Sequence, residues 1–180
     1  SNYRNMKKIY IYLTAFLLTF SANSIFADGF NSIHTIDGIN VIAVGNEARI
    51  FRTTNSGTNW GSQSSSGPNF MSVCGLGINV WIGGDNGYVY KTAIVYSPLQ
   101  STYIGENFSI NSIQFTDANT GFLCGNGGRL YKSTNGGTNW NVSNTGISNV
   151  KLNSISFKDN LNGAVVGENG VCFITNNGGT

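Results

Sequence analysis

Short apolar segments recur along the chain, separated by clusters of Gly, Asn and Ser. The most apolar of them are continuous rather than alternating, at residues 41–44, 80–82, 122–124 and 164–166. Continuous apolar runs of this length are typical of strands buried on both faces. Gly-rich clusters between them are typical of tight turns that need a positive φ. The pattern therefore predicts an all-β protein built from short strands.

A glycine-hairpin segment sets the register of a repeat. It begins at Gly45, Gly84, Gly125 and Gly167, so successive copies are 39, 41 and 42 residues apart. An Asn-Ser-Ile segment, or Met-Ser-Val in the second copy, precedes each hairpin. A strand-rich period of about 40–45 residues is typical of β-propeller blades. We predict four-stranded antiparallel blades at residues 30–64, 70–104, 110–144 and 152–180.

The third strand of each repeat leads into an Asp-box, Ser/Thr-x-Asn-x-Gly-x-x-Trp. Copies at residues 53–60 and 133–140 are complete, a third begins at Thr175, and the second repeat has none. The Asn side chain can bind the main chain two residues on, the Gly allows a positive φ, and the Trp can pack beneath the turn. We predict a structural role for Asn55, Gly57, Trp60, Asn135, Gly137, Trp140, Asn177 and Gly179.

The combined unit, fullest at residues 110–140, resembles the repeats of the photosystem II stability/assembly factor-like propeller family. The resemblance covers roughly residues 30–180 and implies a seven-bladed propeller that commonly acts as a non-enzymatic binding scaffold. Asp-boxes also occur in sialidases, sortilin-type receptors and xyloglucan-degrading propeller enzymes. Because about four repeats are present and the last ends inside its Asp-box, we expect the N-terminal fragment of a longer propeller.

Residues 1–27 have the pattern of a signal peptide with a few residues upstream of its start. Met6 is followed by two lysines, an apolar run at residues 9–20 and a small-residue zone ending at Ala27. We expect cleavage after Ala27, a secreted, periplasmic or cell-surface chain at residues 28–180, and no membrane span in that chain. An uncleaved membrane anchor is the alternative.

Removing this segment changes the charge of the protein. Three basic residues leave with it, so ten become seven against eight acidic residues, and the formal charge changes from +2 to −1. The chain then lacks the basic character expected of a nucleic-acid-binding protein. We predict no nucleic-acid partner.

Most acidic residues lie in repeated turns. One column after the first strand holds Asp37, Asp117 and Asp159, and the hairpin turn holds Glu47, Asp85 and Glu168. A glycosidase uses two carboxylates placed across a sugar, and the remaining Asp28 and Glu106 do not supply such a pair. We expect no catalytic residue and no cofactor in this segment.

The three cysteines lie about fifty residues apart, which is not a metal-ligand spacing. Cys124 and Cys172 fall within apolar strand patterns. We therefore predict no metal site, and we expect these thiols to be buried.

Candidate partner-binding residues are basic columns and aromatics that break the repeat. Arginine is suited to bidentate carboxylate binding, and loop aromatics on a rigid scaffold are typical of binding surfaces. On these grounds the candidates are Arg49, Arg52, Arg129, Lys132, Tyr96 and Tyr103. The alternatives are solvated charges that keep a strand rim soluble and sequence drift in the second repeat.

The sequence favours an exported scaffold that binds a protein or glycan partner. One alternative is a sialidase-like or xyloglucanase-like enzyme whose catalytic residues lie mostly outside this segment. The sialidase resemblance implies an arginine cluster and a Tyr nucleophile, whereas the three arginines beyond residue 27 are divided between the first repeat, with Arg49 and Arg52, and the third, with Arg129. A surface adhesin-type repeat module is the other alternative.

Overall fold

The computed structural model describes residues 29–63, 67–95, 97–143, 146 and 148–179. These residues form three four-stranded sheets and one three-stranded sheet, all antiparallel. Blade one contains β1 (Phe30–Thr35), β2 (Val41–Gly45), β3 (Ile50–Thr53) and β4 (Gly61–Gln63). Blade two contains β5 (Phe70–Leu76), β6 (Asn79–Gly84), β7 (Tyr88–Ala93) and β8 (Gln100–Tyr103). Blade three contains β9 (Ile110–Phe115), β10 (Gly121–Gly125), β11 (Leu130–Ser133) and β12 (Asn141–Val142). Blade four contains β13 (Leu152–Phe157), β14 (Gly163–Gly167) and β15 (Cys172–Thr175).

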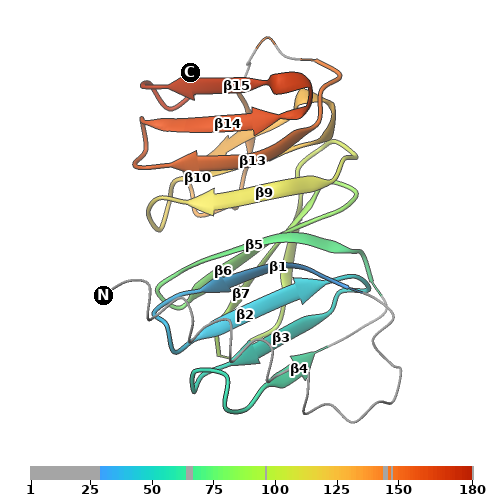
Figure 1. Ribbon diagram of the computed structural model, residues 1–180, viewed down its shortest axis with the longest axis vertical. Helices are drawn as coiled ribbons and strands as arrows, with labels where there is room; N and C mark the ends of the chain where they lie inside the picture. The colour runs from blue at the N-terminus through green and yellow to red at the C-terminus, as the bar shows by residue number, and fades with distance from the viewer. Residues whose placement is uncertain (1–28, 64–66, 96, 144–145, 147, 180) are drawn as a thin grey trace.

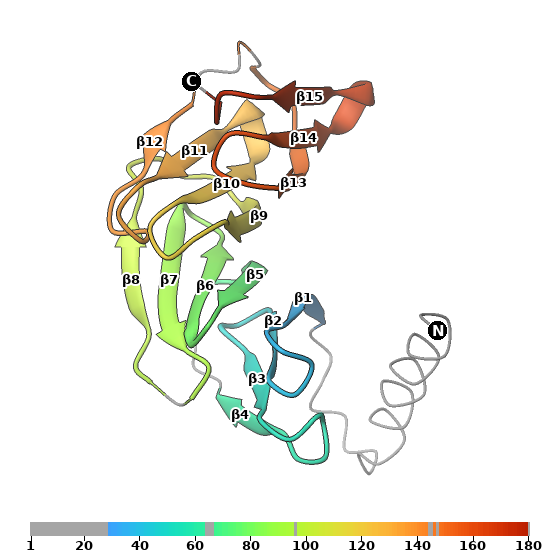
Figure 2. The same cartoon turned by 90° about the vertical axis from the view of Figure 1, so that its left-hand side faces the viewer.

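The blades follow one another along an arc (Figures 1 and 2). In Figure 2 the first strand of each blade lies on the concave side and the last strand on the convex side. The predicted all-β propeller architecture with antiparallel blades is confirmed, with four strands in blades one to three and three described strands in blade four. The predicted signal peptide at residues 1–27 lies outside the described residues.

Apolar side chains of successive blades pack against one another and form the core. Trp81 of β6 stacks on Phe115 of β9 with ring centroids 3.8 Å apart, and Phe122 of β10 stacks on Phe157 of β13 at 3.6 Å. Trp81 and Phe122 lie in the continuous apolar runs at residues 80–82 and 122–124, which are buried as predicted. The run at residues 164–166 differs, because Val166 is 42% exposed. The hydrophobic core is therefore divided among the contacts between blades.

The Asn-Ser-Ile segment joins the first strands of neighbouring blades. The Asn111 amide donates to the Leu152 carbonyl at 2.8 Å, and the Ile155 N–H donates to the Ser112 hydroxyl at 3.3 Å. Asn31 and Ser32 make equivalent bonds to β5 in blade two. The repetition of this segment thus reflects an inter-blade contact.

The Asp-box is a hydrogen-bonded turn. The Ser133 hydroxyl accepts the N–H groups of Asn135 and Gly137 at 3.4 and 2.9 Å, and the Asn135 side-chain oxygen accepts the Asn139 N–H at 2.9 Å. The Asn side chain therefore binds the main chain four residues on, not two as expected, because the hydroxyl occupies the nearer position. Trp140 is buried and donates to the Gly137 carbonyl at 3.2 Å.

The acidic column after the first strand also stabilises turns. The Asp117 carboxylate accepts the N–H groups of Asn119 and Thr120, both at 2.7 Å, and Asp37 and Asp159 accept bonds from equivalent positions. These bonds, led by the one from Thr120, lower the pKa of Asp117 to about 2, and equivalent bonds lower the pKa values of Asp37 and Asp159. The column is structural, as its repetition predicted.

This arrangement predicts acid-sensitive stability. A carboxyl whose pKa is lower in the folded than in the unfolded chain stabilises the fold above the unfolded value, near 3.8, and this stabilisation is lost as the pH falls towards 2. We expect the midpoint temperature of unfolding to fall over this range. Asp117→Asn should weaken the dependence because the amide oxygen still accepts hydrogen bonds but does not ionise. Thermal unfolding followed by circular dichroism at a series of pH values measures this midpoint temperature. The same pH dependence in Asp117→Asn as in the unaltered chain would contradict the stabilising role of the Asp117 carboxylate.

The cysteines divide into two environments. Cys74 and Cys124 are buried, and burial raises the pKa of both thiols to about 12. Cys172 is exposed, so the expectation of a buried thiol is wrong at this position. It lies on β15, where Phe173 and Ile174 are also exposed.

Candidate functional site

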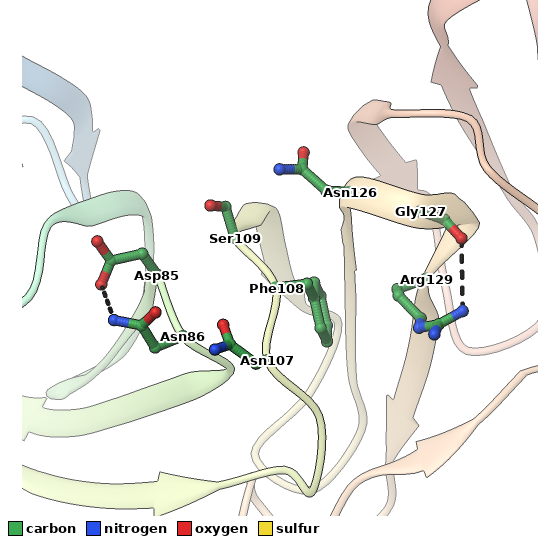
Figure 3. Close-up of a pocket in the computed structure, with 8 residues that line it drawn as sticks. All are labelled: Asp85, Asn86, Asn107, Phe108, Ser109, Asn126, Gly127 and Arg129. Atoms are coloured by element: carbon green, nitrogen blue, oxygen red, sulfur yellow. Dashed lines mark hydrogen bonds between the residues drawn. The ribbon is translucent and has the colours of Figure 1, made fainter.

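A polar groove lies between blades two and three (Figure 3). It has a volume of about 490 Å³. Its lining comes from the β6–β7 turn, the loop that joins the two blades, and the β10–β11 turn, and consists of Asp85, Asn86, Asn107, Phe108, Ser109, Asn126, Gly127 and Arg129. Figure 3 shows these side chains along the opening between the two blades.

Main-chain hydrogen bonds hold the inter-blade loop, residues 104–109, against both hairpin turns. The Gly87 N–H donates to the Phe108 carbonyl at 2.8 Å, and the Ile104 N–H donates to the Gly87 carbonyl at 3.0 Å. On the other side the Asn126 N–H donates to the Ser109 carbonyl at 3.3 Å. The groove is therefore bounded by fixed backbone, which reduces the conformational entropy lost when a ligand binds.

The charged groups of the groove differ in their partners. Arg129 forms an ion pair with Glu106, and both side chains are partly exposed. Burial, followed by the nearby Glu106 carboxylate, raises the pKa of Tyr131, which lies beneath this pair. The Asp85 carboxylate accepts a hydrogen bond from the Asn86 amide at 3.2 Å. One cation and two carboxylates thus line or flank the groove.

A series of aromatic rings in blade two leads from the core to the surface near the groove. Phe70 and Tyr90 have ring centroids 5.0 Å apart, Tyr90 and Tyr88 lie 6.2 Å apart, and Tyr88 and Tyr103 lie 5.1 Å apart. Phe70 is fully buried, whereas Tyr103 is 51% exposed. Tyr103 is therefore an exposed ring supported from below by other rings.

One of the predicted partner-binding residues, Arg129, lines this groove. Tyr103 does not line it but lies close by, next to Gly87, where a Cβ added to that glycine would meet the Tyr103 ring at 3.4 Å. Tyr96 lies outside the described residues. Whether Arg129 and Tyr103 bind a partner stays a prediction.

The other basic candidates occupy positions between or within blades. Arg49 and Arg52 are only 8% and 3% exposed, and Arg52 donates to the Thr92 hydroxyl of blade two at 3.3 Å. Lys132 lies over the Phe122 ring and donates to the Gly178 carbonyl of blade four at 3.2 Å. These positions fit contacts that hold neighbouring blades together, and they do not form a continuous basic stripe.

Sequence reasoning identified Arg129 but missed the other polar members of the groove. The repeat assigns Asp85 to a turn, and the sequence gives Asn107 no binding role. The signal that could have found them is the non-repeating loop at residues 104–109, which lies between two hairpin turns of known register.

The described residues contain no group of three or more His, Cys, Asp or Glu side chains that could hold a metal ion. No helix within the described ranges is long and apolar enough to cross a membrane. The groove offers amide, hydroxyl, carboxylate and guanidinium groups, which suit the binding of a polar ligand.

Comparison with known proteins gives one family and several similar folds. The family model described as photosynthesis system II assembly factor YCF48 matches residues 91–180. No curated protein sequence matches the chain. A structure of YCF48 from Cyanidioschyzon merolae has a TM-score of 0.70 and 17% identity, covering 85% of this chain and 52% of that one.

Two further structures extend the comparison. A structure of YCF48 bound to D1 peptide has a TM-score of 0.66 and 15% identity, covering 89% of this chain and 54% of that one. An ancestral GH74 enzyme has a TM-score of 0.61 and 17% identity, covering 77% of this chain and 22% of that one. At these identities the likeness shows the fold alone. The chain spans about half the length of the two YCF48 structures.

Proposed function

Since this chain belongs to the photosynthesis system II assembly factor YCF48 family, we propose that it is a non-enzymatic scaffold that binds an extended segment of a partner protein in the groove between blades two and three. The observation that carries this proposal is the groove itself, which combines a fixed backbone with polar side chains. Such a site can bind a peptide main chain without first ordering its own loops.

The comparison with a peptide complex supports a protein partner. One of the similar structures is YCF48 bound to D1 peptide. We take from it the class of ligand, a peptide, and not its identity or its position. A glycan partner has no comparable support.

An enzymatic function has weaker support. The GH74 likeness concerns the fold, and the acidic column at Asp37, Asp117 and Asp159 is used to stabilise turns. Beside the groove, Glu106 is engaged by Arg129. We therefore propose binding without turnover.

Export is a separate part of the proposal. It rests on the pattern of residues 1–27, in which two lysines, an apolar run and a small-residue zone follow Met6. N-terminal sequencing of the protein recovered from its native compartment tests it, with Asp28 as the expected first residue. A chain that retains residues 6–27 would contradict cleavage.

Filling the groove should weaken peptide binding. Twelve-residue peptides selected from a random display library on the unaltered chain serve as probes, and fluorescence anisotropy measures their affinity. We expect Ser109→Trp to weaken binding at least about tenfold, because the indole occupies space that the peptide main chain needs. Ser62→Trp, on exposed β4 of blade one, is the matched control and should bind as the unaltered chain does. Equal affinity of the two variants, or no selected peptide, would overturn the proposed site.

A further inference from the structure

We infer that the groove between blades two and three is selective for extended segments that carry a basic side chain. This inference rests on the proposed function, because it names the class of segment that the same groove takes. It follows from three features of the described residues: the uncompensated carboxylate of Asp85, the asparagine side chains that line the groove, and the exposed ring of Tyr103.

The first feature is the charge balance. Arg129 lies in an ion pair with Glu106, so its guanidinium is already engaged by a carboxylate. Asp85 takes part in neither of the two ion pairs formed by the described residues and accepts only a neutral amide donor. A bound segment therefore meets a groove with one carboxylate in excess. A lysine or arginine near Asp85 gains a charge-assisted hydrogen bond, whereas an acidic residue there is repelled.

The second feature is the set of side-chain amides. Asn86, Asn107 and Asn126 line the groove from three different segments. The Asn126 side-chain oxygen accepts a bond from Asn111 at 2.9 Å, which leaves the Asn126 amide hydrogens to donate to a ligand. Amide groups provide both donors and acceptors. They match the alternating N–H and C=O groups of an extended main chain, as strands do when they add to a sheet.

The third feature is Tyr103, whose ring lies next to Gly87, the residue that follows the groove-lining Asn86. Its ring is 51% exposed and is supported by Tyr88 at 5.1 Å. An exposed aromatic face attracts a cation. The same chain uses this interaction between paired strands of one blade, where Lys91 lies over the Trp81 ring in blade two and Lys132 over the Phe122 ring in blade three, each at 5.3 Å. Tyr103 can therefore stabilise a basic side chain that leaves the groove.

These features argue against the acidic partner that the basic columns suggested. Arg49 and Arg52 are buried, Lys132 reaches a carbonyl of blade four, and Arg129 is engaged by Glu106. An acidic segment in the groove would therefore face Asp85 without an unengaged guanidinium to offset the repulsion.

The peptide selection described above provides the test. We expect peptides enriched on the unaltered chain to contain more lysine and arginine than the starting library. For one such peptide, replacing its basic residue with Gln should lower the affinity about two- to fivefold, the range for a partly exposed charge pair, and Glu should lower it further. Asp85→Asn should remove the preference for the basic peptide over its Gln version.

The matched control is Glu168→Gln, which alters the equivalent turn position in blade four and should keep the preference. Enrichment of acidic or uncharged peptides, or an unchanged preference in Asp85→Asn, would overturn the selectivity while leaving peptide binding in place. If every selected peptide binds Ser109→Trp as tightly as it binds the unaltered chain, the proposed function itself fails, and the selectivity fails with it.

Discussion

Replacing Trp81 with alanine should lower the free energy of unfolding by about 3–5 kcal/mol, the range for removing a buried large aromatic side chain. The indole is fully buried, stacks on Phe115 and donates to the Gly136 carbonyl of blade three at 3.0 Å. It is therefore a main contact between blades two and three. Urea-induced unfolding followed by circular dichroism measures the change.

Two further variants separate the contribution of the indole N–H from that of the buried ring and provide an exposed control. Trp81→Phe keeps an aromatic ring against Phe115 but removes the donor, so it should cost less, about 1–2 kcal/mol. Tyr103→Ala, at an exposed position, should change stability by no more than about 0.5 kcal/mol. A loss below about 1 kcal/mol for Trp81→Ala would contradict the assignment of the stack to the inter-blade core.

Gly87→Ala should both destabilise the protein and abolish peptide binding. Gly87 has a φ of +72°, where an L-residue is strained by about 1–2 kcal/mol. A Cβ there would also collide with the main-chain carbonyl of Glu106, a group that cannot move without shifting the inter-blade loop. We expect this collision to lower the free energy of unfolding by about 1–3 kcal/mol in addition to the backbone strain. We also expect peptide affinity to fall at least about tenfold, because the loop forms a wall of the groove.

Gly170 provides a close control for this change. It occupies the equivalent turn position in blade four, has a φ of +74°, and has no other atoms within 4 Å of an added Cβ. Gly170→Ala should therefore show only the strain of the left-handed backbone and should leave peptide binding unchanged. Thermal unfolding and anisotropy on both variants make the comparison. Equal losses of stability would show that the contact between Gly87 and the loop has no energetic weight.

The architecture could be predicted from the sequence because its determinants are local and repeated. The apolar run at residues 122–124 is buried on both faces, as its continuity predicted, and the Asn111–Ser112 segment recurs because it binds the next blade. Periodicity identifies equivalent positions. It does not show which neighbour each side chain meets.

The basic columns illustrate that limit. Lys91 and Lys132 share a column, and both donate to an Asp-box carbonyl of the following blade, Gly136 and Gly178. Blade two has no Asp-box, and there Arg52 reaches Thr92 instead. The sequence indicated surface charges at these positions. Which residue of the next blade each side chain contacts depends on how the blades pack together, and the repeat pattern does not contain that information.

The groove could not be predicted for a related reason. Its walls come from two hairpin turns and the loop at residues 104–109, and hydrogen bonds to Gly87 and Asn126 decide the path of that loop. Asp85 is a turn residue, as predicted, and it also lines the groove. The repeat pattern accounts for Asp85 as a turn residue, so it gave no reason to consider Asp85 as a binding residue.

The central claim is that a partner segment binds between blades two and three. Chemical-shift changes of the backbone amides, recorded by NMR while a selected basic peptide is added, test it most directly. We predict that the largest changes lie at residues 85–87, 103–109 and 126–129. Changes concentrated on the Asp-box turns at residues 53–60 and 133–140, with the groove amides unaffected, would contradict the claim.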